Sequence, residues 1–570
     1  MIESSQGERL LTDLEIAQSV TPRSILDIGA QLGIRAEELT CYGRDKAKVS
    51  PEILTRLNTA SKGHYVLVTA INPTPLGEGK TTTSIGLAMG LARLGHRAAL
   101  TLRQPSLGPV FGVKGGGTGG GRAQVIPMEE INLHLTGDAH AVAASHNLLS
   151  AFVDNHLFHG NRLSIDPQKT TWPRTLNVND RALREIVLGE GTSGRHGQFV
   201  ITEASEIMAV LALAKDQRDL RERLRRIVVG LTTSGKPVRA EELGCVGAME
   251  VLLKDALKPN LVQTLEGTPA FVHTGPFGNI AHGNCSIISD AIALRCADFV
   301  VTEAGFGSDL GAEKFFNIKC RVSGDAPAVA VVVATLRALK LHGGGGVAKA
   351  GAPLPTSLTG PNQEALSKGI ANLQQHVANV RAHGVPVVVA VNAFKDDPRS
   401  ELDWVREQSM EMGAVDAAVS THWADGGKGA EQLAAAVAKA VQTPGQFKHL
   451  YDVSWPIKKK IEAIAMNMYG AAGVQFEPEA ERQIDTAEVL GYGNMPVCMA
   501  KTPLSLSHDS ALKGRPIGFI VPIKELRILA GAGFVTAVCS GIQLMPGLPK
   551  KPAGERISLD ETSGKIIGLS

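Results

Sequence analysis

The chain of 570 residues, 44% apolar and 20% charged, is long enough to bury a large core and to form roughly two to four domains. Its 58 basic and 56 acidic side chains leave a formal charge of only +2, so no global field would attract nucleic acid or an anionic membrane surface. Any anionic ligand must therefore be held by a local site.

The composition also indicates where the protein works. Its seven cysteines are scattered, with no C-x-x-C pair, so neither disulfides nor a structural zinc ion is expected. No basic segment followed by an apolar one begins the chain, and the longest apolar stretch, residues 326–336, is far shorter than the roughly 20 residues that cross a bilayer. We therefore expect a cytoplasmic protein that neither crosses a membrane nor binds nucleic acid.

Short β-branched runs alternate with helical patterns along the chain. Five runs are expected to form strands: residues 65–71, 98–102, 299–302, 328–334 and 385–391. They are apolar on both faces, as strands are when helices cover both sides of a parallel sheet. The sequence therefore predicts an α/β fold, with a doubly wound, mostly parallel sheet like that of P-loop NTPases and additional smaller α/β domains.

The run 65–71 leads into a glycine-containing loop and then into a helical pattern. Strand, glycine loop and helix are the context of a phosphate-binding loop, because backbone N–H groups and the helix N-terminus then face the phosphate. Lys80 would supply a mobile charge at the β- and γ-phosphates, and the Thr81 hydroxyl would reach a magnesium ion. The residues assigned to the nucleotide are Thr74, Pro75, Leu76, Gly77, Glu78, Gly79, Lys80, Thr81 and Thr82.

The loop departs from the strict G-x-x-x-x-G-K-[ST] pattern, because Thr74 stands where the first glycine should be. A turn that merely caps a helix is the alternative. Strand context, glycine spacing, lysine and hydroxyl all favour phosphate binding. The loop alone indicates a nucleotide, and it distinguishes neither ATP from GTP nor one reaction from another.

Arg103 follows the strand-like run 98–102, about one strand–helix unit after the phosphate loop. Its planar guanidinium could bind a phosphate or a carboxylate, and a surface salt bridge is an equal alternative. Soon afterwards, six glycines lie within the seven residues 115–121. Such a segment is often a flexible linker, but a linker here would split the sheet, so a binding loop that approaches a ligand closely is favoured.

Residues 341–361 are rich in glycine and proline and form the best candidate domain boundary. They precede residues 362–384, where apolar residues recur every three or four positions and a glycine ends the pattern, which predicts an amphipathic helix. A weaker boundary falls near residues 471–474. We therefore expect a nucleotide-binding α/β core over 1–360, a second α/β domain over 361–473, and a smaller C-terminal α/β domain over 474–570.

Several segments in combination resemble formate–tetrahydrofolate ligase, also called formyltetrahydrofolate synthetase. The matching stretches are residues 69–83, 103–109, 131–138, 258–266, 302–315 and 545–549. Together they span most of the chain in the family's order. The resemblance implies a monofunctional, homotetrameric enzyme that uses ATP with Mg²⁺ to join formate to tetrahydrofolate, giving 10-formyltetrahydrofolate, ADP and phosphate.

The implied reaction runs through formyl phosphate, since formate itself has no acceptable leaving group and formyl phosphate can expel phosphate. By residue-to-residue match, Lys80 and Arg103 would hold the transferring phosphoryl group and stabilise its charge. Phe394 and Trp423 match the aromatic pair that would sandwich the pterin ring, and both fall just after predicted strands within 361–473. Core packing is the alternative for each ring.

One departure from the family concerns a monovalent cation. An acidic residue often follows the arginine in this family, near a cation site that includes the residue matching Asp138. Gln104 stands at that position here, and its carbonyl oxygen can coordinate a cation without contributing charge. Gln104 and Asp138 are therefore candidate ligands of K⁺ or NH₄⁺.

Two other functions stay open at this point. A nucleotide-switch ATPase or GTPase that acts on a protein partner would need the same phosphate loop, and it would need no pterin site. A related acyl-activating enzyme could use the same loop on another small carboxylate.

Overall fold

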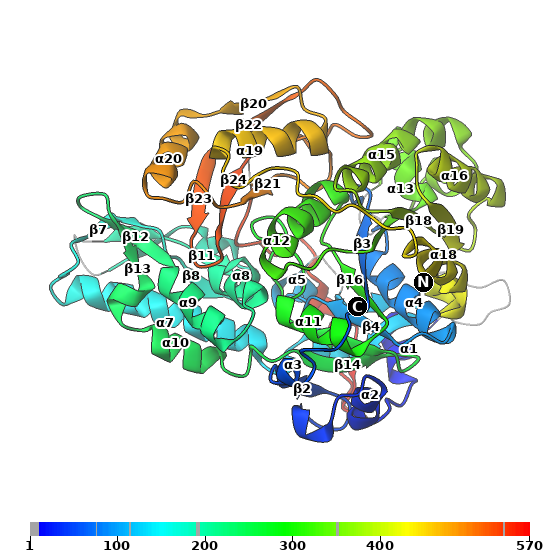
Figure 1. The fold of residues 1–570 in the computed structure, drawn as a ribbon, viewed down its shortest axis with the longest axis horizontal. Helices are drawn as coiled ribbons and strands as arrows, with labels where there is room; N and C mark the ends of the chain where they lie inside the picture. The colour runs from blue at the N-terminus through cyan, green and yellow to red at the C-terminus, as the bar shows by residue number, and fades with distance from the viewer. Residues whose placement is uncertain are drawn as a thin grey trace.

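The computed structural model describes residues 11–75, 77–112, 116–189, 194–348, 353–539 and 542–569. A 12-stranded sheet forms its centre (Figure 1). The seven parallel strands of this sheet, in spatial order, are β15 (Pro269–Val272), β4 (Ala98–Leu102), β16 (Phe299–Glu303), β3 (His64–Ala70), β17 (Val329–Ala334), β18 (Val387–Asn392) and β19 (Asp416–Ser420).

Antiparallel strands extend the sheet beyond β15. They are β14 (Asn260–Thr264), β2 (Ala47–Val49), β1 (Leu39–Cys41), β6 (Ala123–Ile126) and β5 (Gly119–Gly120). The predicted α/β class and the large, mostly parallel sheet are therefore confirmed, and the five predicted runs correspond to β4, β16, β3, β17 and β18.

Alternate residues of the central strands enter two separate cores, which explains why the runs are apolar throughout. In β3, Tyr65 and Leu67 pack into one core and Val66 and Val68 into the other. The first core is closed by α11 (Ile287–Cys296), α13 (Leu336–His342) and α15 (Gln363–Ala382), and the second by α4 (Lys80–Arg93) and α18 (Glu431–Ala440). Helices thus cover both faces of the sheet, as predicted.

The predicted amphipathic helix is α15. The Asn362 side chain caps it by accepting a hydrogen bond from the Ala365 N–H, and Gly384 follows its end with φ +73°. The predicted boundary at residues 341–361 lies between strands of the same sheet, because β17 pairs with β18 and β18 pairs with β19. The division into 1–360, 361–473 and 474–570 stays a prediction.

Two smaller units flank the sheet (Figure 1). One contains α7 (Asp138–Phe158), α8 (Glu206–Leu213), α9 (Gln217–Arg226), α10 (Val246–Leu253), β7 (Ile165–Thr170), β8 (Arg174–Leu176), β9 (Ile186–Leu188), β10 (Arg195–Gly197), β11 (Phe199–Ile201), β12 (Val228–Thr232) and β13 (Pro237–Arg239). The other, orange to red, contains α19 (Ile457–Ile464), α20 (Pro478–Val489), β20 (Gly473–Phe476), β21 (Val497–Ala500), β22 (Ile520–Ile523), β23 (Glu525–Leu529) and β24 (Phe534–Val538). It has a hydrophobic core of its own.

The other α-helices and strands of the described residues are α1 (Asp13–Gln18), α2 (Ile25–Gln31), α3 (Ile53–Arg56), α5 (Leu107–Phe111), α6 (Met128–Asn132), α12 (Cys320–Ser323), α14 (Thr356–Thr359), α16 (Arg399–Glu411), α17 (His422–Asp425), β25 (Ser558–Leu559) and β26 (Ile566–Ile567). The turn η6 (Ser308–Ala312) is π-helical. Within the described ranges, no helix is both long enough and apolar enough to cross a membrane.

Candidate active site

The carboxyl ends of the parallel strands meet at one edge of the sheet, where ligands of such sheets bind. The phosphate loop follows β3, and Arg103 follows β4. Glu303 is the last residue of β16, which lies between these two strands. Phe394 and Trp423 follow the neighbouring strands β18 and β19. The topology therefore brings the predicted nucleotide and folate residues to the same edge.

The phosphate loop turns through two glycines in the left-handed region, Gly77 with φ +72° and Gly79 with φ +73°. The Glu78 carboxylate accepts a hydrogen bond of 2.7 Å from the Thr74 N–H, which ties the two sides of the loop together. Burial raises the pKa of Glu78 to about 7, and the positive charge of Lys80 opposes this rise. The assigned Leu76 lies outside the described residues.

A side chain at position 79 would displace the side chain of Asn392. The Asn392 side-chain amide donates to the Glu78 carbonyl oxygen at 3.2 Å, and a Cβ on Gly79 would lie 2.5 Å from Asn392 Nδ2. Lys80 and Thr81, both half-buried, begin α4 directly after this glycine, and Thr82 is also half-buried. Pro75 lies exposed in the loop.

Glu303 joins the phosphate loop to Arg103. Its Oε2 accepts a hydrogen bond of 2.6 Å from the Thr81 hydroxyl, and its Oε1 lies 4.0 Å from Nη2 of Arg103. Sequence reasoning missed Glu303. The signal was an acidic residue at the end of a buried strand, but only the strand order shows that this strand lies beside β3.

Arg103 lies against the backbone that follows β15 and β16. Its Nη1 donates to the Pro276 carbonyl oxygen at 3.2 Å, and a Cβ on Gly305 would lie 2.9 Å from Nη2. Burial lowers the pKa of Arg103, and Glu303 opposes this effect. About a quarter of the side chain stays accessible, with 24% of its surface exposed, so the guanidinium can still meet a ligand.

Buried polar groups without a partner among the described residues lie on the segments around Arg103. They are Oε2 of Glu203, Oγ1 of Thr274, Oδ1 of Asn279, both ring nitrogens of His282 and both side-chain polar atoms of Asn284. Burial raises the pKa of Glu203 to about 7 and, with nearby cations that include Arg103, lowers the pKa of His282. An unsatisfied buried polar group costs about 1–3 kcal/mol, so such groups are typical of sites that bind a polar ligand. No pattern in the sequence predicts this cluster.

The two aromatic residues are held by different partners. The Phe394 ring is half-buried, with the guanidinium carbon of Arg337 3.8 Å from its centroid. Trp423 is 48% exposed and packs on the glycine-rich hairpin of β5 and β6: a Cβ on Gly121 would lie 2.8 Å from Cδ2 of the indole. The Arg122 N–H also donates to the Trp423 carbonyl oxygen at 2.8 Å. Gly120 and Gly121 therefore allow the tryptophan to pack directly on the backbone of this hairpin.

Asp138 and Gln104 contact different groups. The two Asp138 oxygens accept hydrogen bonds of 2.7 Å, one from Lys48 Nζ and one from Asn260 Nδ2. Both Lys48 and Asp138 are buried. Gln104 is also buried, and its backbone N–H donates to the Thr274 carbonyl oxygen at 2.6 Å. The positive charge beside Asp138 is thus already supplied by a lysine.

Comparison with known proteins gives a consistent result. A family model described as formate–tetrahydrofolate ligase matches residues 11–570. The formate–tetrahydrofolate ligase of Roseiflexus sp. (strain RS-1) is 52% identical over 565 residues, which cover 98% of this chain and 100% of the relative. That of Saccharopolyspora erythraea is 53% identical over 98% of this chain and 99% of its own length, and that of Desulforamulus reducens is 51% identical over 99% and 100%.

Proposed function

The chain belongs to the formate–tetrahydrofolate ligase family, and from that premise we propose how the site described above performs the reaction. The enzyme uses ATP to join formate to tetrahydrofolate, giving 10-formyltetrahydrofolate. The relatives give no support to the alternative of a nucleotide switch that acts on a protein partner.

We assign the phosphates of ATP to the loop of residues 74–82, as in a P-loop NTPase. Two left-handed glycines and the start of α4 support this assignment, because they direct backbone N–H groups toward a phosphate. The hydroxyl of Thr81 and the carboxylate of Glu303, 2.6 Å apart, are hard oxygen donors of the kind that Mg²⁺ prefers. When bound, the ion would neutralise charge on the transferring phosphoryl group.

The observation that carries the mechanism is the continuous chain Thr81–Glu303–Arg103, which connects the phosphate loop to a second, fixed cation. A formate oxygen attacks the γ-phosphorus, the bond to ADP breaks, and formyl phosphate forms. Lys80 and Arg103 stabilise the negative charge that spreads over the phosphoryl oxygens. The Thr274 hydroxyl and Asn284 Nδ2 are buried hydrogen-bond donors without a partner among the described residues, and they support a formate site beside Arg103, because a carboxylate accepts hydrogen bonds.

In the second step, the folate N10 attacks the formyl carbon, the bond to phosphate breaks, and the N10 proton leaves with the phosphate. We assign the pterin ring to Phe394 and Trp423, which follow neighbouring strands at the same sheet edge. The exposed indole of Trp423 supports stacking, because its seat on the glycine hairpin fixes the ring at little cost in conformational entropy.

We also propose Asp138 and Gln104 as ligands of K⁺ or NH₄⁺, which would share the Asp138 carboxylate with Lys48. Replacing KCl by tetramethylammonium chloride at constant ionic strength tests this site. We expect the rate to fall, because the site holds only small cations, and an unchanged rate would contradict the proposal. We also propose a cytoplasmic homotetramer, as the family resemblance implies. Light scattering of the purified protein tests the assembly.

The deciding experiment is a coupled assay of ADP release in which formate and tetrahydrofolate are omitted in turn. We expect ADP release to require formate, and Lys80→Ala to abolish it while circular dichroism and thermal unfolding stay unchanged, because Lys80 is only half-buried. Lys368→Ala, which removes a lysine that is 65% exposed on α15, is the matched control. Formate-independent ADP release, or full turnover by Lys80→Ala, would contradict the mechanism.

A further inference from the structure

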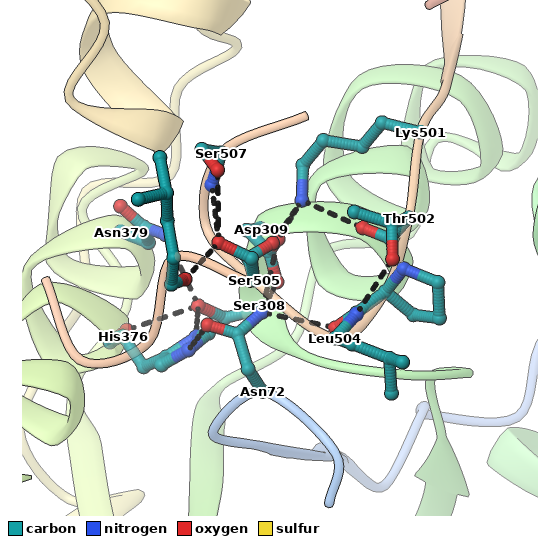
Figure 2. Close-up of polar contacts among 12 residues, drawn as sticks. Asn72, Ser308, Asp309, His376, Asn379, Lys501, Thr502, Leu504, Ser505 and Ser507 are labelled. Carbon is teal, nitrogen blue, oxygen red and sulfur yellow. Dashed lines mark hydrogen bonds and ion pairs between the residues drawn. The ribbon is translucent and has the colours of Figure 1, made fainter. Parts of the chain in front are cut away.

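Asn72, the second residue after β3, leads directly into the phosphate loop and is fully buried. Its side chain lies at the centre of a polar network (Figure 2). Nδ2 donates to both carboxylate oxygens of Asp309 at 3.3 Å and to the Pro503 carbonyl oxygen at 3.2 Å. Oδ1 accepts from Asn372 Nδ2 at 3.0 Å and contacts His376 Nε2 at 3.1 Å.

The partners fix the orientation of this amide. Burial lowers the pKa of His376 to about 4, so the ring is neutral at neutral pH. Its Nε2 faces an oxygen and must carry the proton, which leaves Nδ1 to accept from the Ser308 hydroxyl at 2.8 Å. The two hydrogens and two lone pairs of the Asn72 amide are then all used. Only one rotamer of Asn72 satisfies the network.

Lys501 brings the C-terminal unit into this network (Figure 2). It follows β21 and is completely buried, as is Asp309. Its three N–H donors are used by Asp309 Oδ2 at 2.7 Å, the Thr502 carbonyl at 3.1 Å and the Ser505 carbonyl at 2.6 Å. Removing either partner would leave an uncompensated buried charge, so the ion pair ties residue 501 to η6. Lys501 thus holds the backbone that presents the Pro503 carbonyl to Asn72.

Gly514 provides a second connection from the same unit. Its N–H donates to His342 Nδ1 at 3.2 Å, and His342 Nε2 in turn lies 3.1 Å from the Asn72 carbonyl oxygen. The carbonyl oxygen of Gly514 accepts a hydrogen bond from Asn372 Nδ2 at 2.7 Å, and the same Asn372 amide donates to Asn72. Both the side chain and the backbone of Asn72 are therefore held by contacts that depend on residues 501–514.

We propose that Asn72, Asn372 and the C-terminal segment 501–514 are positioning elements of the nucleotide site, which hold the start of the phosphate loop in its binding conformation. The far end of the loop is fixed by Asn392 and by α4. With both ends fixed, ATP binding does not have to order the loop, which lowers the entropic cost of binding. This inference rests on the proposed phosphate-binding role of residues 74–82.

Two asparagines on the same face of α15 allow a matched test. Asn372 and Asn379 are both completely buried, but Asn372 contacts Asn72, whereas Asn379 contacts Ser308 and Gln375. Asn372→Ala removes one hydrogen bond to the Asn72 side chain, and Asn72→Ala removes every hydrogen bond of that side chain while its backbone contact with His342 stays. We expect the KM for ATP to rise roughly tenfold in Asn372→Ala and further in Asn72→Ala. The KM values for formate and tetrahydrofolate should stay within about twofold.

Asn379→Ala should lower the melting temperature to a similar extent and leave the KM for ATP within about twofold of the unmodified enzyme. Equal effects of Asn372→Ala and Asn379→Ala on the KM for ATP would overturn the inference, since a merely structural role predicts equality. Asn372→Ala loses a single contact to Asn72, so it keeps the test valid if Asn72→Ala does not fold. Lys80→Ala distinguishes this inference from the proposed function. If Lys80→Ala keeps its activity, the loop does not bind the nucleotide as proposed. If it is inactive and the two asparagine variants have equal KM values for ATP, only the positioning inference is wrong.

Discussion

Gly79→Ala tests whether the phosphate loop depends on its close approach to β18. Alanine at φ +73° costs about 1 kcal/mol in backbone strain. Its Cβ would also lie 2.5 Å from Asn392 Nδ2, so the amide must move and lose its hydrogen bond to Glu78, which costs about 1 kcal/mol more. The loop conformation should therefore lose about 2 kcal/mol relative to distorted alternatives, which corresponds to a rise of roughly thirtyfold in the KM for ATP.

Gly95→Ala is the control, because Gly95 follows the other end of α4 with φ +89° and an added Cβ would meet nothing within 4 Å. It carries the same backbone strain without the collision. The measurements are the KM for ATP and the rise in melting temperature that ATP causes. Adding Asn392→Ala to Gly79→Ala should restore part of the affinity, because the colliding amide is gone. Equal KM values for Gly79→Ala and Gly95→Ala would refute the steric reasoning.

Three further changes have separate readouts. Trp423→Ala should raise the KM for tetrahydrofolate at least about tenfold and leave the KM for ATP unchanged, while Phe158→Ala, which removes a ring that is 83% exposed, should change neither. Glu303→Gln keeps an acceptor for Thr81 but loses the charge, so we expect a higher Mg²⁺ requirement and a lower kcat, and an unchanged Mg²⁺ titration would exclude Glu303 as a ligand. Burial raises the pKa of Glu206 to about 7 from an ordinary value of 4.5, so the folded protein binds this proton more tightly than the unfolded chain. Stability from this group is present below about pH 4.5 and is lost as the pH rises to about 7, by up to ~3 kcal/mol. Glu206→Gln retains the acceptor for the Gly531 and Ala532 N–H groups and should reduce that loss, as urea denaturation at pH 5 and pH 8 would measure.

The features that the sequence predicts well are those set by neighbouring residues. The strands near β3 and β17 are apolar because each faces two cores. The apolar residues of α15 recur at helical spacing, and its capping residues lie directly before and after it in the sequence. The glycines, lysine and hydroxyl of residues 74–82 also follow one another along the chain, so a phosphate-binding role can be predicted from them, and that role stays a prediction.

Features that depend on strand order were not predictable. Glu303 acquires its meaning only because β16 lies beside β3, and Lys48 pairs with Asp138 across 90 residues of sequence. In the sequence, His282 does not differ from an ordinary buried histidine. Only the structure shows that neither of its ring nitrogens has a partner among the described residues and that Arg103 lies nearby. A pattern of residue types contains no information on such pairings unless the topology is known.

The Asn72 network has a consequence for how the enzyme is made. Asn72 emerges early from the ribosome, whereas its partner Pro503 follows 431 residues later. Domains generally fold in the order of synthesis, and contacts between such distant residues form late. A growing chain can form β3 and much of the central sheet before it can saturate the Asn72 amide. We therefore expect a growing chain to bind ATP tightly only after its synthesis has passed residue 514.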